Sequence, residues 1–259
     1  MTIALVIPAR FASRRFPGKP LAPLRGATGL EKSLLARSWE AASAVAGVGS
    51  RHVATDDPRI AEEARRIGAP VLMTSPDCAN GTERCAEAVA QLPGVEVVVN
   101  LQGDAPLTPP WFVEALIAAM ADPAIAVATP VLRSGPEALA ALRADRAAGR
   151  VGGTTAVLDC LGRALYFSKE VLPFAGTPDT PVYHHVGVYA YRRTALTAYA
   201  GWDAGALETA EGLEQLRFLE NGVAVTAVKV ESRGAEFWEL NNPEDVPRIE
   251  AVLQSRGTP

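Results

Sequence analysis

The chain has 259 residues with 25 basic and 29 acidic side chains, a formal net charge of −4 and 48% hydrophobic residues. This length fits one large domain, or one and a half, and the composition allows a substantial core, so the chain need not be disordered. The acidic balance supplies no global basic field for nucleic acid. Three irregularly spaced cysteines exclude a disulfide framework and a CxxC zinc site.

Strands and helices alternate through the first half of the chain. Apolar runs predict strands at 2–7, 51–55, 70–73, 95–101 and 125–132, and helices at 30–46, 58–68, 81–92 and 109–121. Such alternation predicts an α/β fold, with a mostly parallel twisted sheet and helices on both faces. Ligands of these sheets bind beyond the carboxyl ends of the strands. The loops that follow the strands are therefore the first places to look for chemistry.

After about residue 150, the pattern of predicted strands and helices changes. Short strands at 154–159, 164–168 and 185–192 alternate with Gly/Pro-rich turns, and a helix at 207–220, a strand at 223–230 and a last helix near 243–254 follow. This pattern predicts a smaller, mixed α+β part. The longest apolar stretch, 111–132, is interrupted by charges and prolines, so no membrane span is expected. The apolar run at 3–9 has no basic region before it and is ended by Pro8 and Arg10, so no targeting segment is expected.

The loop after the first strand, residues 8–20, concentrates positive charge. It reads PARFASRRFPGKP and contains Arg10, Arg14, Arg15 and Lys19, whereas no acidic residue occurs before Glu31. Arginine offers forked contacts and lysine a point charge, so this loop suits a polyphosphate. A solvated basic surface loop is the alternative. The spacing is neither that of a Walker A loop nor GxGxxG.

A second candidate site, NLQGDAP at 100–106, follows the most strand-like run. Asp104 is well placed to hold Mg²⁺ on a triphosphate, because this hard cation prefers carboxylate oxygen. Gln102 offers an amide that could read the edge of a base. The alternative is that Asp104 caps the next helix.

Together, PARFASRRFPGKPL and NLQGDAPL resemble the sugar nucleotidyltransferases of the CMP-activated acidic sugars, and the CMP-Kdo synthetase (3-deoxy-manno-octulosonate cytidylyltransferase) family in particular. Similar segments continue at 53–57, 80–88, 163–169, 184–193, 207–222 and 241–250, so the resemblance spans nearly the whole chain. It implies a nucleotide-diphospho-sugar transferase fold. It also implies an enzyme that converts CTP and an acidic 3-deoxy sugar, Kdo, into CMP-Kdo and pyrophosphate for lipopolysaccharide biosynthesis.

The resemblance also implies roles for single residues. Arg10, Arg15 and Lys19 would neutralise the CTP phosphates, and Asp104 would carry Mg²⁺. Cytosine and ribose would be surrounded by Pro8, Ala9, Arg10, Ser75, Gly81 and Gln102. The acidic sugar would face His185, Tyr189, Glu208, Glu211 and Gln215. The last three fall at i, i+3 and i+7, so one helix face could present them together, although an ordinary exposed polar face is the alternative.

The family pattern further divides the chain into a nucleotide-binding half at about 1–150, a sugar-binding and dimerisation part at about 151–240, and a helix at 241–259 that returns to the core. It implies a cytoplasmic homodimer.

Three positions depart from the family pattern. Asn241 stands where the family has a second metal-binding aspartate, and its neutral amide is a weaker Mg²⁺ ligand than a carboxylate. Either Asn241 binds through its oxygen, or Glu239 substitutes, or the metal stoichiometry differs. Segment 26–33 is longer than the family's turn, and 149–157 lacks a lysine.

Other functions remain open at this stage. The same fold could act on another acid, such as an amino-Kdo or a sialic acid. A non-catalytic nucleotide-binding protein is a second alternative, although the retained basic loop and Asp104 argue against it. A Rossmann dehydrogenase is a third, and the missing GxGxxG argues against it.

Overall fold

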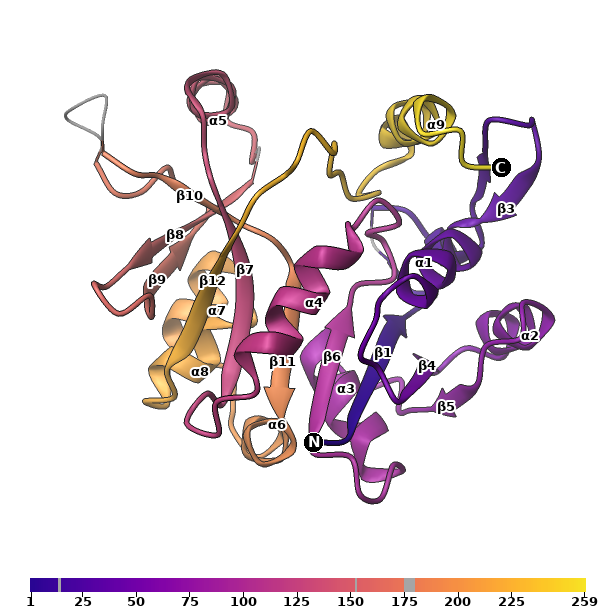
Figure 1. Ribbon diagram of the computed structural model, residues 1–259, viewed down its shortest axis with the longest axis horizontal. Coiled ribbons are helices and arrows are strands. Elements are labelled where there is room, and N and C mark those ends of the chain that lie inside the picture. Colours follow the sequence, from indigo (N-terminus) through magenta and orange to yellow (C-terminus); the bar gives the residue numbers. More distant parts are fainter. Residues whose placement is uncertain (14, 152, 175–179) are drawn as a thin grey trace. The chain divides into compact units, whose positions relative to one another are not determined.

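The computed structural model describes the whole chain except residues 14, 152 and 175–179, and the chain divides into two compact units (Figure 1). The first unit comprises Met1–Glu114 and Ser232–Pro259, and the second comprises Ala115–Glu231. The carboxyl-terminal segment belongs to the first unit. The strand at Val127–Arg133 belongs to the second unit and pairs with other strands of that unit.

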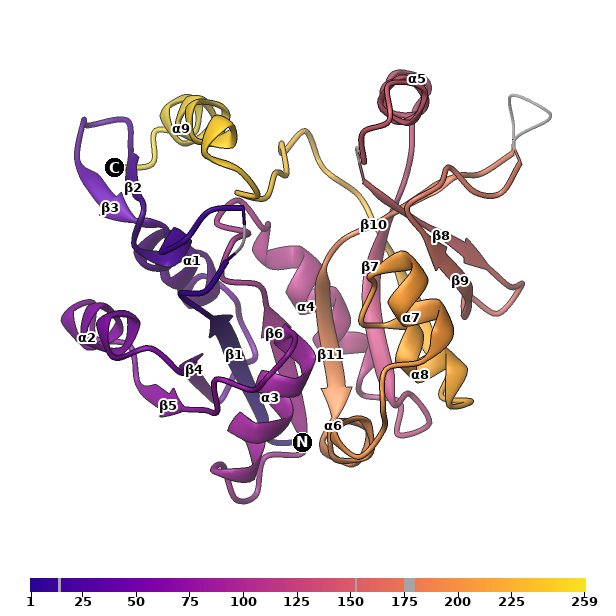
Figure 2. The same ribbon diagram turned by 180° about the vertical axis from the view of Figure 1, so that it is seen from behind.

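A parallel sheet forms the centre of the first unit. Its strands β1 (Ile3–Ala9), β4 (Ser50–Thr55), β5 (Val71–Met73) and β6 (Val97–Leu101) lie in the order β5-β4-β1-β6. The helices α1 (Leu34–Ser43), α2 (Pro58–Arg66) and α3 (Gly81–Ala90) connect them. Right-handed crossovers put α1 and α2 on one face and α3 on the other (Figure 2). The predicted parallel sheet with helices on both faces is confirmed.

Short elements and the carboxyl-terminal segment complete the first unit. They are η1 (Lys19–Leu21), the hairpin β2 (Pro23–Arg25) and β3 (Glu31–Ser33), η2 (Pro243–Asp245) and α9 (Val246–Ser255). The predicted helix at 30–46 was wrong at its start. Residues 31–33 pair with 23–25, and the Ser33 side chain accepts a hydrogen bond from Ala36 N, so the helix begins at Leu34.

The second unit is mixed, as predicted. Antiparallel pairing joins β7 (Val127–Arg133), β8 (Thr154–Leu158), β9 (Ala164–Ser168), β10 (Tyr183–His185) and β11 (Val188–Arg192), whereas β12 (Val225–Val230) runs parallel to β7. The predicted strand at 185–192 is interrupted at 186–187 and becomes β10 and β11, both antiparallel to β7. The helices α5 (Pro136–Ala147) and α6 (Arg193–Ala200) were not predicted, and α4 (Pro110–Ala119) spans the unit boundary.

The predicted helix at 207–220 is wrong, because two short helices occupy this segment. They are α7 (Ala206–Glu211) and α8 (Leu216–Glu220). Gly212 ends α7 in the left-handed region at φ 61°, and its N–H donates to Glu208 O. Gln215 therefore does not continue the helix face that carries Glu208 and Glu211.

Within the ranges that the structure describes, no helix has both the length and the apolar character needed to cross a membrane. The apolar stretch at 111–132 consists of α4, a turn and β7.

Candidate active site

The carboxyl ends of β1 and β6 bring the two predicted site loops together in the first unit. Gly103 approaches the end of β1 so closely that a Cβ there would lie 2.8 Å from Pro8 O. The Ser38 hydroxyl of α1 donates to Gly103 O at 2.9 Å and fixes the second loop. The absence of a side chain at Gly103 thus lets residues 102–104 lie against Pro8 and Ala9.

An ion pair joins the two loops. Lys19 Nζ lies 2.5 Å from Asp104 Oδ2, and the two side chains are 13% and 25% exposed. Gly18 precedes Lys19 at φ 71°, a conformation that favours glycine, and packs on the Phe11 ring. The loop therefore turns back and aims Lys19 at Asp104. Each partner remains accessible enough to exchange the contact for a ligand.

The carboxyl-terminal segment brings Asn241 to the same place. Leu240 N donates to Asp104 O at 2.8 Å, and Arg15 Nη2 donates to Asn241 Oδ1 at 2.8 Å. Asp245 Oδ2 accepts hydrogen bonds from the backbone N–H of Asn241 at 2.9 Å and fixes the turn. The structure thus brings Arg15, Lys19, Asp104 and Asn241 together, and we name these residues with Glu239 the strand-end cluster.

In Glu239 of the strand-end cluster, the surroundings disfavour the charged form of the carboxyl group. Burial raises the pKa of its carboxyl group to about 7, and the negative charge of Asp104 adds to this effect. A hydrogen bond from the Asn241 amide and the positive charges of Lys19 and Arg15 oppose it. The Asn241 side chain therefore bridges two groups, because its oxygen accepts from Arg15 and its amide donates to Glu239.

The strand-end cluster has the donors for a divalent cation that keeps water or phosphate ligands. Among the described residues, no group of three or more His, Cys, Asp and Glu side chains forms a metal-binding cluster. Mg²⁺ commonly uses only one or two protein carboxylates together with substrate phosphates. Asp104 and the electrostatically strained Glu239 fit that requirement, whereas the Asn241 oxygen is already engaged by Arg15.

The start of α3 lies against the second loop. A Cβ on Gly81 would lie 3.0 Å from Gln102 Nε2 and 3.4 Å from Asn100 Nδ2. Asn80 caps the helix through Glu83 N at 2.8 Å, and Arg10 Nη1 donates to Ala79 O at 3.2 Å. Arg10, Gly81 and Gln102 therefore lie in one region.

Two further residues bear on this region. Asn100, which was not predicted, is fully buried on β6, and no described residue hydrogen bonds to either atom of its amide. A buried amide in the first position of NLQGD was an available sequence signal. Ser75, which was predicted, uses its hydroxyl to accept from Asp77 N at 3.0 Å. Arg14 lies outside the described residues.

Three predicted residues meet in the interior of the second unit. His185, Tyr189 and Gln215 are each at most 6% exposed, and the His185 and Tyr189 ring centroids lie 5.5 Å apart. The Tyr189 hydroxyl donates to Gln215 Oε1 at 3.1 Å. Gln215 Nε2 is buried without a hydrogen-bond partner among the described residues. We name these three residues the His185 cluster.

Glu208 and Glu211 are held by internal partners instead. Glu208 forms two hydrogen bonds with Arg217, at 2.6 and 2.8 Å, in a buried ion pair. Glu211 accepts from Ser168 Oγ at 2.6 Å and from Lys169 N at 2.9 Å. Arg217, which sequence reasoning missed, also lies over the Tyr199 ring. These carboxylates anchor α7 to neighbouring elements of the second unit.

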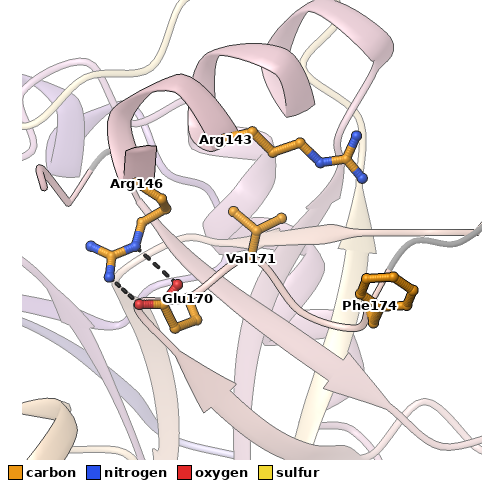
Figure 3. Close-up of a pocket in the computed structure, with 5 residues that line it drawn as sticks. All are labelled: Arg143, Arg146, Glu170, Val171 and Phe174. Carbon is orange, nitrogen blue, oxygen red and sulfur yellow. Dashed lines mark hydrogen bonds and ion pairs between the residues drawn. The ribbon is translucent and has the colours of Figure 1, made fainter. Parts of the chain in front are cut away.

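A separate hollow of about 490 Å³ opens in the second unit (Figure 3). It is lined by Arg143, Arg146, Glu170, Val171 and Phe174. Arg146 pairs with Glu170, and no predicted site residue lines this hollow.

Comparisons with known proteins agree with one another. The family model for cytidylyltransferases matches residues 4–230. The 3-deoxy-manno-octulosonate cytidylyltransferase of Maricaulis maris is 43% identical over 99% of both chains, and that of Myxococcus xanthus is 39% identical over 97% of this chain and 96% of its own.

Solved structures give the same picture. The structure of CMP:2-keto-3-deoxy-manno-octonic acid synthetase complexed with CTP superposes with a TM-score of 0.86 and 31% identity, over 99% of this chain and 100% of that one. The 4-diphosphocytidyl-2C-methyl-D-erythritol synthase of Anaerococcus prevotii, at 15% identity, a TM-score of 0.62 and coverage of 98% of this chain and 96% of its own, shares the fold.

Proposed function

Since this chain belongs to the cytidylyltransferase family, we propose that it activates 3-deoxy-manno-octulosonate (Kdo) with CTP and releases CMP-Kdo and pyrophosphate. The observation that carries this proposal is similarity over 99% of the chain to a relative named for that activity. The strand-end cluster supports it, because a lysine, an arginine and a carboxylate converge where a parallel sheet binds ligands.

In this reaction the anomeric hydroxyl of the sugar attacks the α-phosphorus of CTP, and pyrophosphate leaves. No protein nucleophile is needed, so the chain contributes position and charge. Arg10, Arg15 and Lys19 neutralise the triphosphate. The Lys19 ammonium is held near Asp104 before the ligand arrives, so little reorganisation is needed when phosphate enters.

Asp104 would hold Mg²⁺, with Glu239 as the second carboxylate. When bound, Mg²⁺ would neutralise part of the negative charge on the phosphates. We propose Glu239 as the second carboxylate because it lies beside Asp104, where burial and the like charge of Asp104 disfavour a carboxylate without a cation. Asn241 holds Arg15 and Glu239 in place and acts at most as a weak ligand.

The base and ribose would lie against Pro8, Ala9, Ser75, Gly81 and Gln102. The close packing of Gly81 on Gln102 supports a narrow pocket that fits a pyrimidine. His185, Tyr189 and Gln215 would contact the sugar, and Gln215 Nε2, which has no hydrogen-bond partner among the described residues, supports this role. Glu208 and Glu211 would support the site indirectly, since their carboxylates are already engaged and would repel an acidic sugar.

We further propose a cytoplasmic homodimer that supplies lipopolysaccharide synthesis. Leu161, Leu165 and Phe174 of the second unit are 71%, 61% and 91% exposed, and apolar surface of this kind supports a subunit contact. Sedimentation equilibrium tests the oligomeric state, and a monomer at micromolar concentration would contradict the dimer.

Pyrophosphate release with CTP across a panel of acidic sugars tests the function. Kdo should give the highest kcat/KM, and ATP or GTP should replace CTP poorly. Faster turnover of an amino-Kdo or a sialic acid would reassign the sugar. Nucleotide binding without turnover of any sugar would favour a non-catalytic protein.

A further inference from the structure

The hydroxyl of Thr129 sits at the interruption between β10 and β11. Thr129 is fully buried on β7, and its Oγ1 lies 2.8 Å from Val188 O, 3.2 Å from Val186 O and 3.0 Å from His185 Nε2. A hydroxyl carries one hydrogen, and carbonyl oxygens can only accept. The hydrogen therefore goes to a carbonyl oxygen, of which Val188 O is nearer. A lone pair of Oγ1 then faces His185.

The His185 ring is neutral in this environment. Burial, and secondarily the neighbouring His184, lower the pKa of His185 to about 3. A neutral imidazole carries its hydrogen on one nitrogen, and its other nitrogen is an acceptor. Because Thr129 presents a lone pair to Nε2, the hydrogen belongs on Nε2. Nδ1 then carries a lone pair, and no described residue donates to it.

The side-chain amide of Gln215 offers a hydrogen-bond donor, whereas His185 Nδ1 offers an acceptor. Gln215 Oε1 accepts from the Tyr189 hydroxyl, which leaves Nε2 as a buried donor without an acceptor among the described residues. Buried polar groups without partners are rare in folded proteins and call for a ligand or water. The His185 cluster therefore offers one acceptor and one donor to whatever binds there. Sugar hydroxyls, which both donate and accept, match this pair.

We propose that Thr129 is a positioning residue that holds His185 as its Nε2–H tautomer, so that Nδ1 accepts a hydrogen bond from a hydroxyl of the sugar. This inference rests on the proposed function, because it takes the His185 cluster as the sugar site. A neutral acceptor repels a carboxylate, so His185 reads a hydroxyl and the carboxylate of the sugar binds to other groups. The tautomer is thus a determinant of which face of the acidic sugar enters the cluster.

The test combines nuclear magnetic resonance with kinetics on the full chain. Two-bond ¹H–¹⁵N correlations report the tautomer of each imidazole, and variants His52→Gln and His184→Gln assign the three rings. Wild-type protein and Thr129→Ser, which keeps the hydroxyl, should show His185 protonated at Nε2. Thr129→Val removes the acceptor at almost constant volume. It should shift His185 toward Nδ1–H and raise KM for Kdo about tenfold. KM for CTP and kcat should stay within about twofold of wild type.

Thr155→Val is the matched control. Thr155 is also a buried strand threonine, but its hydroxyl donates to Glu170 O at 2.6 Å and accepts from Leu172 N at 3.2 Å, so both of these hydrogen bonds are to backbone groups. It should change neither the His185 tautomer nor KM for Kdo. Wild-type His185 protonated at Nδ1 would overturn the proposal even if Thr129→Val does not fold. An unchanged tautomer in folded Thr129→Val would also overturn it. If the wild-type enzyme does not use Kdo, the proposed function fails, whereas the spectra still decide the pairing of Thr129 with His185.

Discussion

The strand-end cluster of the first unit is charged and partly exposed, whereas the His185 cluster of the second unit is neutral and buried. In the first, Lys19 and Asp104 form an ion pair whose side chains remain 13% and 25% exposed. In the second, the side chains are at most 6% exposed, Tyr189 is hydrogen bonded to Gln215, and His185 is hydrogen bonded to the neutral Thr129. A triphosphate is recognised by charge, which tolerates some freedom of position. A sugar is recognised by hydroxyl groups, which requires donors and acceptors at fixed places.

Removing the charge of Asp104 should have the largest effect on activity. We expect Asp104→Asn to lower kcat/KM by about 1,000-fold or more, since it removes the carboxylate that we propose holds a divalent cation and the partner of Lys19. Steady-state pyrophosphate release at saturating Mg²⁺ measures this, with circular dichroism to verify folding. A folded Asp104→Asn enzyme with wild-type rate would remove Asp104 from the site.

The buried ion pair of the second unit should matter for stability rather than for ligand binding. Glu208→Gln leaves the buried Arg217 guanidinium without its charge partner, which should lower the free energy of unfolding by about 3–5 kcal/mol. Denaturant titration measures the loss. Arg163→Met is the control, because it breaks the more exposed pair with Asp159, and it should cost under about 1 kcal/mol. A stable Glu208→Gln variant with raised KM for the sugar would instead place Glu208 in the sugar site.

Lys19→Met should reduce the rate without unfolding the chain. Loss of the proposed charge-assisted contact between Lys19 and phosphate corresponds to about 1.5–3 kcal/mol, or roughly ten- to a few-hundredfold in kcat/KM. Lys32 provides a matched comparison, since its ammonium also lies 2.5 Å from a carboxylate, that of Glu40. If Lys32→Met and Lys19→Met lose activity equally, the effect of Lys19 is not specific to the strand-end cluster.

The sequence was sufficient for the central parallel sheet of the first unit because the signals for its strands are local. Apolar runs placed β1 and β6, and the expectation that ligands bind beyond the carboxyl ends of the strands directed attention to Lys19 and Asp104. The hairpin of β2 and β3 was missed because residues 31–33 extend only through pairing with 23–25.

The second unit was harder because its contacts decide its local structure. The left-handed Gly212 breaks the periodicity that suggested one helix, and Arg217 engages Glu208 across the break. Thr129 was hidden for a similar reason: it lies in a strand that appeared to be only core, and its partner is 56 residues away. A polar residue at a buried strand position was the only signal that the sequence contained.

Titration of His185 should make the stability of the chain depend on pH, with a smaller effect than the substitutions above. His185 has its pKa lowered in the folded chain, so between pH 3 and 6.5 the unfolded chain binds more protons and stability falls as pH falls. From pH 7.5 to 5.5, this histidine alone should remove about 1.4 kcal/mol. Urea titrations should show that His185→Gln diminishes this difference by that amount. Tyr191→Phe, in the same aromatic stack, should leave the difference unaltered. An equal pH difference in His185→Gln would show that His185 titrates normally.

The smallest effect concerns Asn241. Its oxygen accepts from Arg15 and its amide donates to Glu239, so the side chain is a bridge rather than a free ligand. Asn241→Asp replaces that amide with a carboxylate beside Asp104 and Glu239. A full negative charge attracts a divalent ion more strongly than an amide dipole does. We therefore expect the Mg²⁺ concentration for half-maximal rate to fall roughly three- to tenfold, with little change in kcat.

Direct Mn²⁺ binding, followed by electron paramagnetic resonance, separates this effect from altered catalysis. Asn241→Asp should bind Mn²⁺ more tightly than wild type, and Glu239→Gln should bind it more weakly. Asn242→Asp adds the same charge one residue away, in a position whose backbone N–H is held by Asp245 Oδ2 at 2.7 Å, and should shift binding less. The competing idea is that Asn241 tunes the choice of sugar and never approaches the metal. Unchanged Mn²⁺ affinity in Asn241→Asp, together with altered preference among acidic sugars, would favour that idea, because charge added at a metal site cannot leave the affinity for the cation unaltered.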